Sequence, residues 1–220
     1  MAFTIHRIRK LNLFQQLTEK SWAVHGPMEE LPPADVIAGS VRRTGLWTLL
    51  AVVSALFGLF IAAYFLRSDY PDWVPVEDPA VLWLNTVLLV FASIAFQLAR
   101  NAAERGDRKR TQRELLLGGL LTLAFLAGQY WAWEQLRLTG AYVVSDAAYA
   151  FFYLLTGLHA LHLAGGLYVW LRVMVRMWRN SDQNNVNQLN KLRLSVELCS
   201  TYWHYLLLVW LVLFGLLLNT

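Results

Sequence analysis

The stretch that decides the fold is residues 45–66, GLWTLLAVVSALFGLFIAAYFL, in which no side chain carries a charge. Its length matches the roughly 20 residues that an α-helix needs to cross about 30 Å of hydrocarbon. Because lipid offers the backbone no hydrogen bonds, such a segment has to be helical. Four further uncharged runs of similar length follow, at 79–99, 115–133, 147–171 and 198–218. The sequence therefore predicts an all-α integral membrane protein, a bundle of five transmembrane helices.

The composition agrees with a surface that faces lipid. Hydrophobic residues make up 57% of the 220 residues and charged residues only 15%, which is outside the usual range for soluble domains. Ten Trp and nine Tyr are typical of a protein with membrane interfaces. The net charge of +4 comes from short basic blocks between the apolar runs, so we expect no nucleic-acid partner.

Lysine and arginine are distributed unevenly between the two ends of the predicted helices. Six precede residue 45, six lie within 100–113 and five lie within 172–193, whereas only Arg67 and Arg137 lie elsewhere. The positive-inside rule then places the N-terminus in the cytoplasm and, after five crossings, the C-terminus on the periplasmic side. We expect residues 1–44 to form a cytoplasmic N-terminal arm and residues 45–220 to form the transmembrane domain.

Four ionisable side chains stand out in or beside the last two spans. His159 and His162 lie three residues apart in the fourth span, and Glu197 and His204 lie seven apart around the start of the fifth, so each pair shares a helix face. Ionisable groups at such depths usually face protein or water. We interpret all four as structural polar contacts between helices. Specifically, we expect Glu197 and His204 to meet the fourth span through His159 or His162.

A haem site is the alternative interpretation of two of these residues. His162 and His204 lie at similar depths, about nine and six residues from the cytoplasmic ends of their spans at roughly 1.5 Å per residue. They could therefore be the two axial ligands of one haem. We expect no metal site, because the histidines and Glu197 show no HxxxH or HExxH spacing. We also expect no catalytic residues, since the sequence has no Gly-rich phosphate loop, paired carboxylates or activated nucleophile.

Other polar and small residues in the spans have structural interpretations. Gln97 and Gln129 are single amides in apolar runs, and we expect them to form hydrogen bonds between helices. The glycine pairs 118–119 and 165–166 are expected to let helices approach closely.

Two motifs carry a resemblance to a known family. The fourth span contains TGLHALH at 156–162, and the fifth contains Glu197, Tyr-Trp-His at 202–204, Trp210 and Leu-Phe at 213–214. Together they resemble the last two helices of cytochrome c oxidase subunit III. Further similar segments lie upstream, at 62–64 (AAY), 81–86 (VLWLNT) and 125–129 (FLAGQ). The resemblance covers about residues 42–218.

The resemblance implies a subunit of a haem-copper terminal oxidase in a bacterial inner membrane. Such a subunit has no haem, copper or catalytic residue of its own and packs against the catalytic subunit I, with subunit II as a further partner. Haem and copper are then expected in the partner subunits. By stabilising subunit I, the chain would support aerobic respiratory electron transport and proton uptake. Membrane lipids are the remaining partners, and a bound phospholipid is compatible with the family.

The chain departs from the family pattern at three places. Ser54 is followed by Ala55 where the family usually has a glutamate, and Leu207 stands where an aspartate usually follows Tyr-Trp-His. The two additional N-terminal helices of longer members, which help to form a lipid-holding cleft, are also missing. From these departures we expect no role that depends on the missing carboxylates and no comparable cleft.

Three other functions are alternatives to this reading. One is a small membrane haem-b electron carrier that uses His162 and His204. Another is an accessory subunit of a quinol oxidase or a nitric oxide reductase. A transporter or channel ranks last, because the spans contain few charges and no pair of broken helices.

Overall fold

The computed structural model describes residues 34–71, 73, 80–138, 146–179 and 186–218. Within these ranges the regular structure is α-helical: α2 (Ala34–Ser68), α3 (Val81–Glu104), α4 (Arg108–Leu138), α5 (Ala147–Arg179) and α6 (Val186–Leu218). Each helix contains a segment long and apolar enough to cross a membrane, so the prediction of five membrane-spanning helices is confirmed. Residues 1–33 of the expected N-terminal arm lie outside the described ranges. Gly39–Thr220 forms one compact unit.

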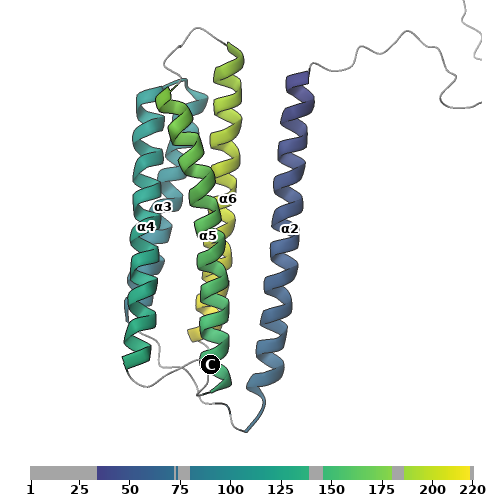
Figure 1. The fold of residues 1–220 in the computed structure, drawn as a ribbon, viewed down its shortest axis with the longest axis vertical. Helices are drawn as coiled ribbons and strands as arrows, with labels where there is room; N and C mark the ends of the chain where they lie inside the picture. The colour runs from purple at the N-terminus through teal and green to yellow at the C-terminus, as the bar shows by residue number, and fades with distance from the viewer. Residues whose placement is uncertain (1–33, 72, 74–79, 139–145, 180–185, 219–220) are drawn as a thin grey trace, which may run out of the picture. The chain divides into compact units, whose positions relative to one another are not determined.

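Helices α3, α4, α5 and α6 form a closed ring in which each helix packs against two others (Figure 1). Close backbone contacts join α3 to α4, α4 to α5, α5 to α6 and α6 back to α3. The outer surface of these helices is apolar, as shown by Leu84 of α3, which is 58% exposed, and Leu120 of α4, which is 52% exposed. In water such a surface would aggregate, whereas in a bilayer it meets acyl chains.

Helix α2 contacts the ring through side chains. Among the described residues, no close backbone contact joins α2 to another helix. Instead Val53 and Phe57 of α2 pack with Leu155 of α5 and with Val209 and Leu213 of α6 in one buried cluster. From Gly39 onwards, α2 is therefore attached to α5 and α6 by a single layer of side chains.

Four buried or half-buried indoles donate hydrogen bonds from one helix of the ring to another. The bonds are Trp133 Nε1 to Thr156 Oγ1 (3.0 Å), Trp170 Nε1 to the Leu115 carbonyl (2.8 Å), Trp203 Nε1 to Thr122 Oγ1 (2.9 Å) and Trp210 Nε1 to Thr86 Oγ1 (3.0 Å). Each of the three threonines also donates its hydroxyl proton to the carbonyl four residues earlier in its own helix. The hydroxyl oxygen is thus left with a lone pair for the indole, and both partners are satisfied without water.

A tight turn connects α3 to α4. Gly106 has a φ of 77°, and its N–H donates to the Ala103 carbonyl at 3.1 Å, while the Asp107 N–H donates to the Ala102 carbonyl at 3.0 Å. This pair of bonds is a Schellman motif, which ends α3. The Asp107 carboxylate then accepts from the Arg110 N–H at 3.0 Å and caps the start of α4. We call this end of the unit, where α3 turns into α4 and α5 ends before α6, the basic end.

Replacing Gly106 by alanine is expected to lower the free energy of unfolding by about 1 kcal/mol, because a Cβ atom is strained at positive φ. Space is not limiting, since the nearest atom to an added Cβ would be Nη2 of Arg193 at 3.7 Å. Gly106→Asn is the matched control, because asparagine tolerates the left-handed region and should lose less. Unfolding by SDS titration of the purified protein measures both. Equal losses in the two variants would contradict the conformational explanation.

Candidate functional site: polar contacts and a groove between the helices

A cluster of polar side chains joins α6 to α3 within the apolar spans. The His204 ring is bonded through Nδ1 to the Ser93 hydroxyl and through Nε2 to Oε1 of Gln97, the latter at 2.9 Å. The Ser200 hydroxyl lies 3.3 Å from the same Nε2. Gln97 in turn donates from Nε2 to Oδ1 of Asn101 at 3.1 Å. A neutral imidazole that donates through Nε2 and accepts at Nδ1 fits these bonds, so the cluster needs no net charge.

Glu197 of α6 pairs with Arg43 of α2 near the basic end. Oε2 of Glu197 accepts from Nη2 of Arg43 at 2.9 Å, and the two side chains are 31% and 56% exposed. The Tyr205 hydroxyl of α6 also reaches α2: it lies 2.8 Å from the Ser54 hydroxyl and donates to the Leu50 carbonyl at 3.2 Å. These polar contacts and the buried apolar cluster hold α2 against α6.

His162 of α5 contacts both α2 and α6. Its Nδ1 lies 2.8 Å from the Leu158 carbonyl one turn earlier, and its ring centroid lies 5.6 Å from that of Phe57 of α2. Its backbone carbonyl accepts from the hydroxyl of Tyr202 on α6 at 3.0 Å. The imidazole therefore bonds within its own helix, and the link to α6 is made by the backbone.

His159 is fully buried between aromatic rings at the centre of the ring of helices. Its centroid lies 6.0 Å from that of Phe125 on α4 and 5.3 Å from that of Trp210 on α6. Neither ring nitrogen has a hydrogen-bond partner among the described residues. A buried polar group without a partner reduces stability by about 1–3 kcal/mol.

Exchange of His159 for phenylalanine is expected to leave the free energy of unfolding unchanged or to raise it by about 1 kcal/mol. The change removes an unpaired polar group and keeps a planar ring. His204→Phe is the control and should lose about 2 kcal/mol, because that ring bonds to three side chains. SDS titration of both variants measures their free energies of unfolding. A loss of stability in His159→Phe as large as that in His204→Phe would contradict this prediction and would indicate that His159 has a hydrogen-bond partner such as an ordered water.

The polar partners of α6 differ from those that we expected. Among the described residues, Glu197 bonds to α2 and His204 to α3, and neither side chain forms a hydrogen bond with His159 or His162. The reason is the rotation of α6. This helix turns Tyr202 towards α5, and at 100° per residue positions 197 and 204 then point to the opposite side.

The two alternative haem ligands also lie apart. The His204 ring is bonded to side chains of α3, whereas the His162 ring contacts Phe57 of α2 and bonds within α5. Two axial ligands would have to face each other across one macrocycle, and these two imidazoles do not. In the part of the chain that the structure describes, no group of three or more His, Cys, Asp or Glu side chains is placed to hold a metal ion.

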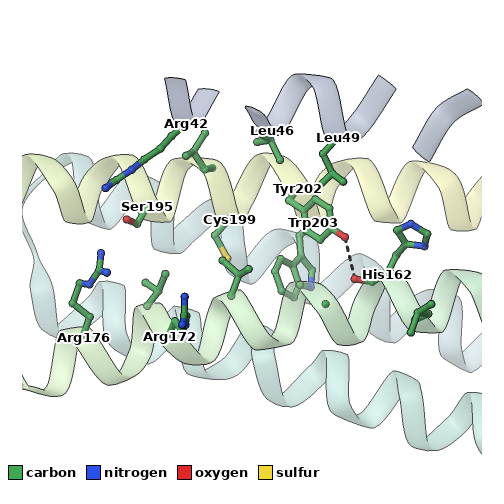
Figure 2. A pocket seen from close by; sticks show the side chains of 16 residues that line it. Arg42, Leu46, Leu49, His162, Arg172, Arg176, Ser195, Cys199, Tyr202 and Trp203 are labelled. Carbon is green, nitrogen blue, oxygen red and sulfur yellow. Dashed lines mark hydrogen bonds between the residues drawn. The ribbon is translucent and has the colours of Figure 1, made fainter. Parts of the chain in front are cut away.

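A groove of about 680 Å³ lies between α2, α5 and α6. Towards the basic end its lining includes the guanidinium groups of Arg42, Arg172 and Arg176 and the hydroxyl of Ser195, as Figure 2 shows. Further along, the rings of Tyr202 and Trp203, with His162 and Cys199, line the groove (Figure 2). The rest of this part of the lining is aliphatic side chains and glycines: Leu46, Leu49, Leu161, Val169, Val173, Leu198, Gly165 and Gly166. The groove is thus apolar along most of its length and cationic at one end.

The sequence indicated some of these contacts and missed others. The prediction that Gln97 and Gln129 bond between helices is confirmed, by His204 and by Asn85 Nδ2 at 3.4 Å. Ser93 was missed, although it precedes Gln97 by four residues and therefore lies on the same face of α3. Arg43 was also missed, because a basic residue before a span is equally consistent with a topology signal.

The fold and these contacts define a polytopic helical membrane protein whose intramembrane polar side chains mostly bond helix to helix. Residues 46–218 match the family model described as cytochrome c oxidase subunit III. The chain belongs to the cytochrome c oxidase subunit III family.

Individual relatives agree with this assignment. The chain is similar to cytochrome c oxidase subunit 3 of Synechocystis sp., with 30% identity over 179 residues that cover 79% of this chain and 73% of the relative. A probable cytochrome c oxidase subunit 3 of Mycobacterium tuberculosis is 31% identical over 162 residues, 71% of this chain and 76% of the relative. A heme-copper oxidase subunit I+III of Aeropyrum pernix is 27% identical over 185 residues, 79% of this chain and 22% of the relative.

Membership of this family defines the class of function. The chain is a subunit of a haem-copper oxidase, its family is non-redox, and subunit III associates with subunit I in the complex. The chain is therefore a multi-pass membrane protein of the respiratory chain. The similarities support this reading and not that of a small haem-b electron carrier.

Proposed function

We propose that this chain is the structural third subunit of a cytochrome c oxidase, in which it stabilises the catalytic subunit and thereby supports oxygen reduction and proton uptake. Haem and copper belong to the partner subunits, and subunit II is a further partner. The relative from Aeropyrum pernix supports contact with subunit I, because its name combines subunits I and III in one chain.

One observation carries the structural role: polar side chains of α6 that could serve chemistry are engaged in bonds to neighbouring helices. His204 is held by Ser93 and Gln97 of α3, and Glu197 is held by Arg43 of α2. Groups engaged in this way stabilise a rigid scaffold, which suits a subunit that supports another one.

The orientation that we propose has the basic end in the cytoplasm of a bacterial cell, with the protein in the inner membrane. Residues 34–44 of the expected arm belong to α2. The part of the arm that precedes α2 then lies on the cytoplasmic side of the membrane domain, and the C-terminus is periplasmic. The arginines of the α3–α4 turn and of the end of α5 support this orientation through the positive-inside rule. A reporter enzyme that is active only in the periplasm should be active when it is fused after Leu218. An inactive reporter would indicate the opposite orientation.

We further propose that the groove between α2, α5 and α6 holds a phospholipid. Arg42, Arg172 and Arg176 suit an anionic headgroup, and the aliphatic lining beyond them suits an acyl chain. The test is lipid analysis of the purified complex. Arg172→Gln with Arg176→Gln should lose tightly bound anionic lipid, whereas Arg179→Gln, which lies outside this groove, should retain it. Equal lipid content in all variants would contradict the proposal.

Retention of the subunit in the oxidase tests the structural role. His204→Leu removes the bonds of the imidazole to Ser93 and Gln97 of α3, and we expect the variant to be lost from the detergent-purified oxidase. Leu123→Ala on the exposed side of α4 is the control and should be retained. Unchanged retention and unchanged oxidase stability with His204→Leu would contradict the role proposed for this cluster.

A further inference from the structure

The outward stripe of α6 consists of Glu197, Thr201, His204, Leu208 and Leu211. We infer that this stripe is the surface on which a transmembrane helix of the catalytic subunit docks. The inference rests on the proposed function and names the surface that serves it.

The five residues share one face of α6 because they follow each other at intervals of four, three, four and three residues. Leu208 is 59% exposed and Leu211 is 47% exposed, and Glu197, Thr201 and His204 are partly exposed. The opposite face of α6 is buried in the ring of helices: Val196, Trp203, Leu206, Trp210 and Leu213. The stripe therefore points away from the core of this chain.

Helices α2 and α3 flank the stripe on its two sides. Arg43 of α2 reaches Glu197, and Gln97 of α3 reaches His204. Within the described ranges, no close backbone contact joins α2 to α3. The stripe is thus an exposed face of α6 that lies between two helices of the same chain.

The basic-end half of the stripe is polar and suits a protein partner better than lipid. Thr201 donates its hydroxyl proton to the Glu197 carbonyl, which leaves its oxygen able to accept a further bond. Gln97 donates one N–H to Asn101 and keeps a second. Acyl chains cannot use this remaining capacity, whereas polar side chains of another transmembrane helix can. The side chain of Arg100, 35% exposed, adds a charged group on the α3 flank.

The other half of the stripe allows the close approach of a partner helix. Leu208 and Leu211 are exposed aliphatic side chains, and Gly215 follows them on the same face with no atom within 4 Å of the position of an added Cβ. Small and aliphatic residues at such spacing favour helix packing in membranes. The exposed face of α4 differs, because Leu117, Leu120 and Leu123 offer no polar group and suit lipid contact.

Cross-linking in the assembled oxidase tests this docking surface. In a Cys199→Ala background, Thr201→Cys and Leu208→Cys would each carry a maleimide-linked benzophenone, with Leu120→Cys and Leu123→Cys on α4 as controls. After illumination of the membranes, the cross-linked products are identified by mass spectrometry. We expect the α6 probes to cross-link to the catalytic haem-copper subunit and the α4 probes to react with lipid only.

The possible outcomes separate this inference from the proposed function. If the chain purifies with the haem-copper subunit but the catalytic subunit is cross-linked from α4 and not from α6, the docking surface is wrong and the proposed function stands. Cross-links from α6 only to lipid or to a second copy of this chain overturn the inference as well. If no haem-copper subunit accompanies the chain, the proposed function itself fails.

A steric variant provides a second measurement that does not depend on labelling. Leu208→Trp adds bulk to the stripe without touching the core, and Leu123→Trp adds the same bulk on α4. We expect about tenfold lower retention in the purified complex for Leu208→Trp and unchanged retention for Leu123→Trp. Equal retention of both variants would contradict the docking surface.

Discussion

Replacing Trp210 by alanine is expected to lower the free energy of unfolding by about 3–5 kcal/mol, the range for removal of a large aromatic side chain from a packed core. Trp210 is fully buried, and its ring centroid lies 4.9 Å from that of Phe125 and 5.3 Å from that of His159. Its Nε1 donates to Thr86 on α3. Removal of the indole would therefore leave a cavity where α3, α4, α5 and α6 meet. SDS titration of the purified variant measures it.

Two further substitutions separate the packing of Trp210 from its hydrogen bond. Trp210→Phe keeps most of the ring volume and loses the bond to Thr86, so we expect a loss of about 1–2 kcal/mol. Trp131→Ala removes an indole that is 63% exposed and should change stability by no more than about 0.5 kcal/mol. Equal losses for Trp210→Ala and Trp131→Ala would contradict the ring of helices described here.

Replacing Gly119 by alanine is expected to cost about 3 kcal/mol, at the upper end of the range for overpacked cores. An added Cβ atom would lie 2.2 Å from Cζ2 of Trp170, much closer than two carbon atoms can approach without a shift. The indole would have to leave the contact between α4 and α5 and give up its hydrogen bond to the Leu115 carbonyl. Thermal unfolding in detergent and SDS titration both report the effect.

A double-mutant cycle identifies the cause of this loss. In a Trp170→Leu background, Gly119→Ala should cost much less than in the native background, because the clashing ring is gone. Gly165→Ala is the matched control, since no atom lies within 4 Å of an added Cβ there, and it should be neutral or slightly stabilising. If Gly119→Ala lowers stability by the same amount in the Trp170→Leu background, the clash with the indole is not the cause of the loss.

The glycine pairs illustrate what spacing alone can and cannot predict. The expected close helix contacts are confirmed at Gly118, Gly119 and Gly166, which meet Phe96, Trp170 and Tyr202 respectively. At Gly165 the expectation is wrong, because this residue faces open space along the groove. Small residues mark a face that allows close approach, but the rotation of the helix decides which of two neighbours is used.

The five spans could be predicted because uncharged length alone decides whether a helix can cross a bilayer. The ends of the helices could not. Helix α5 continues to Arg179, well past the apolar run that ends at 171, and α6 begins at Val186, before the run that starts at 198. Beyond the hydrocarbon, intrahelical hydrogen bonds and helix-forming residues extend a helix, and neither leaves a hydropathy signal.

The polar contacts were only partly predictable for a related reason. A histidine deep in an apolar span is energetically costly unless it has a polar partner, so the sequence indicates that His204 has one. It does not indicate that the partners are Ser93 and Gln97 of α3. Which helix lies beside α6 depends on the order of helices in the ring. The indole bonds to Thr86 and Thr122 depend in addition on the relative height of two helices, which the sequence of either one does not specify.

The most direct test of the structural role in the oxidase is a mild purification through a tag on this chain, followed by reduced-minus-oxidised spectra and identification of the accompanying subunits. We predict that oxidase haems appear only together with a large multi-helix partner, and that the chain separated from that partner is colourless. Haem b bound to the isolated chain would contradict this prediction and the structural role with it.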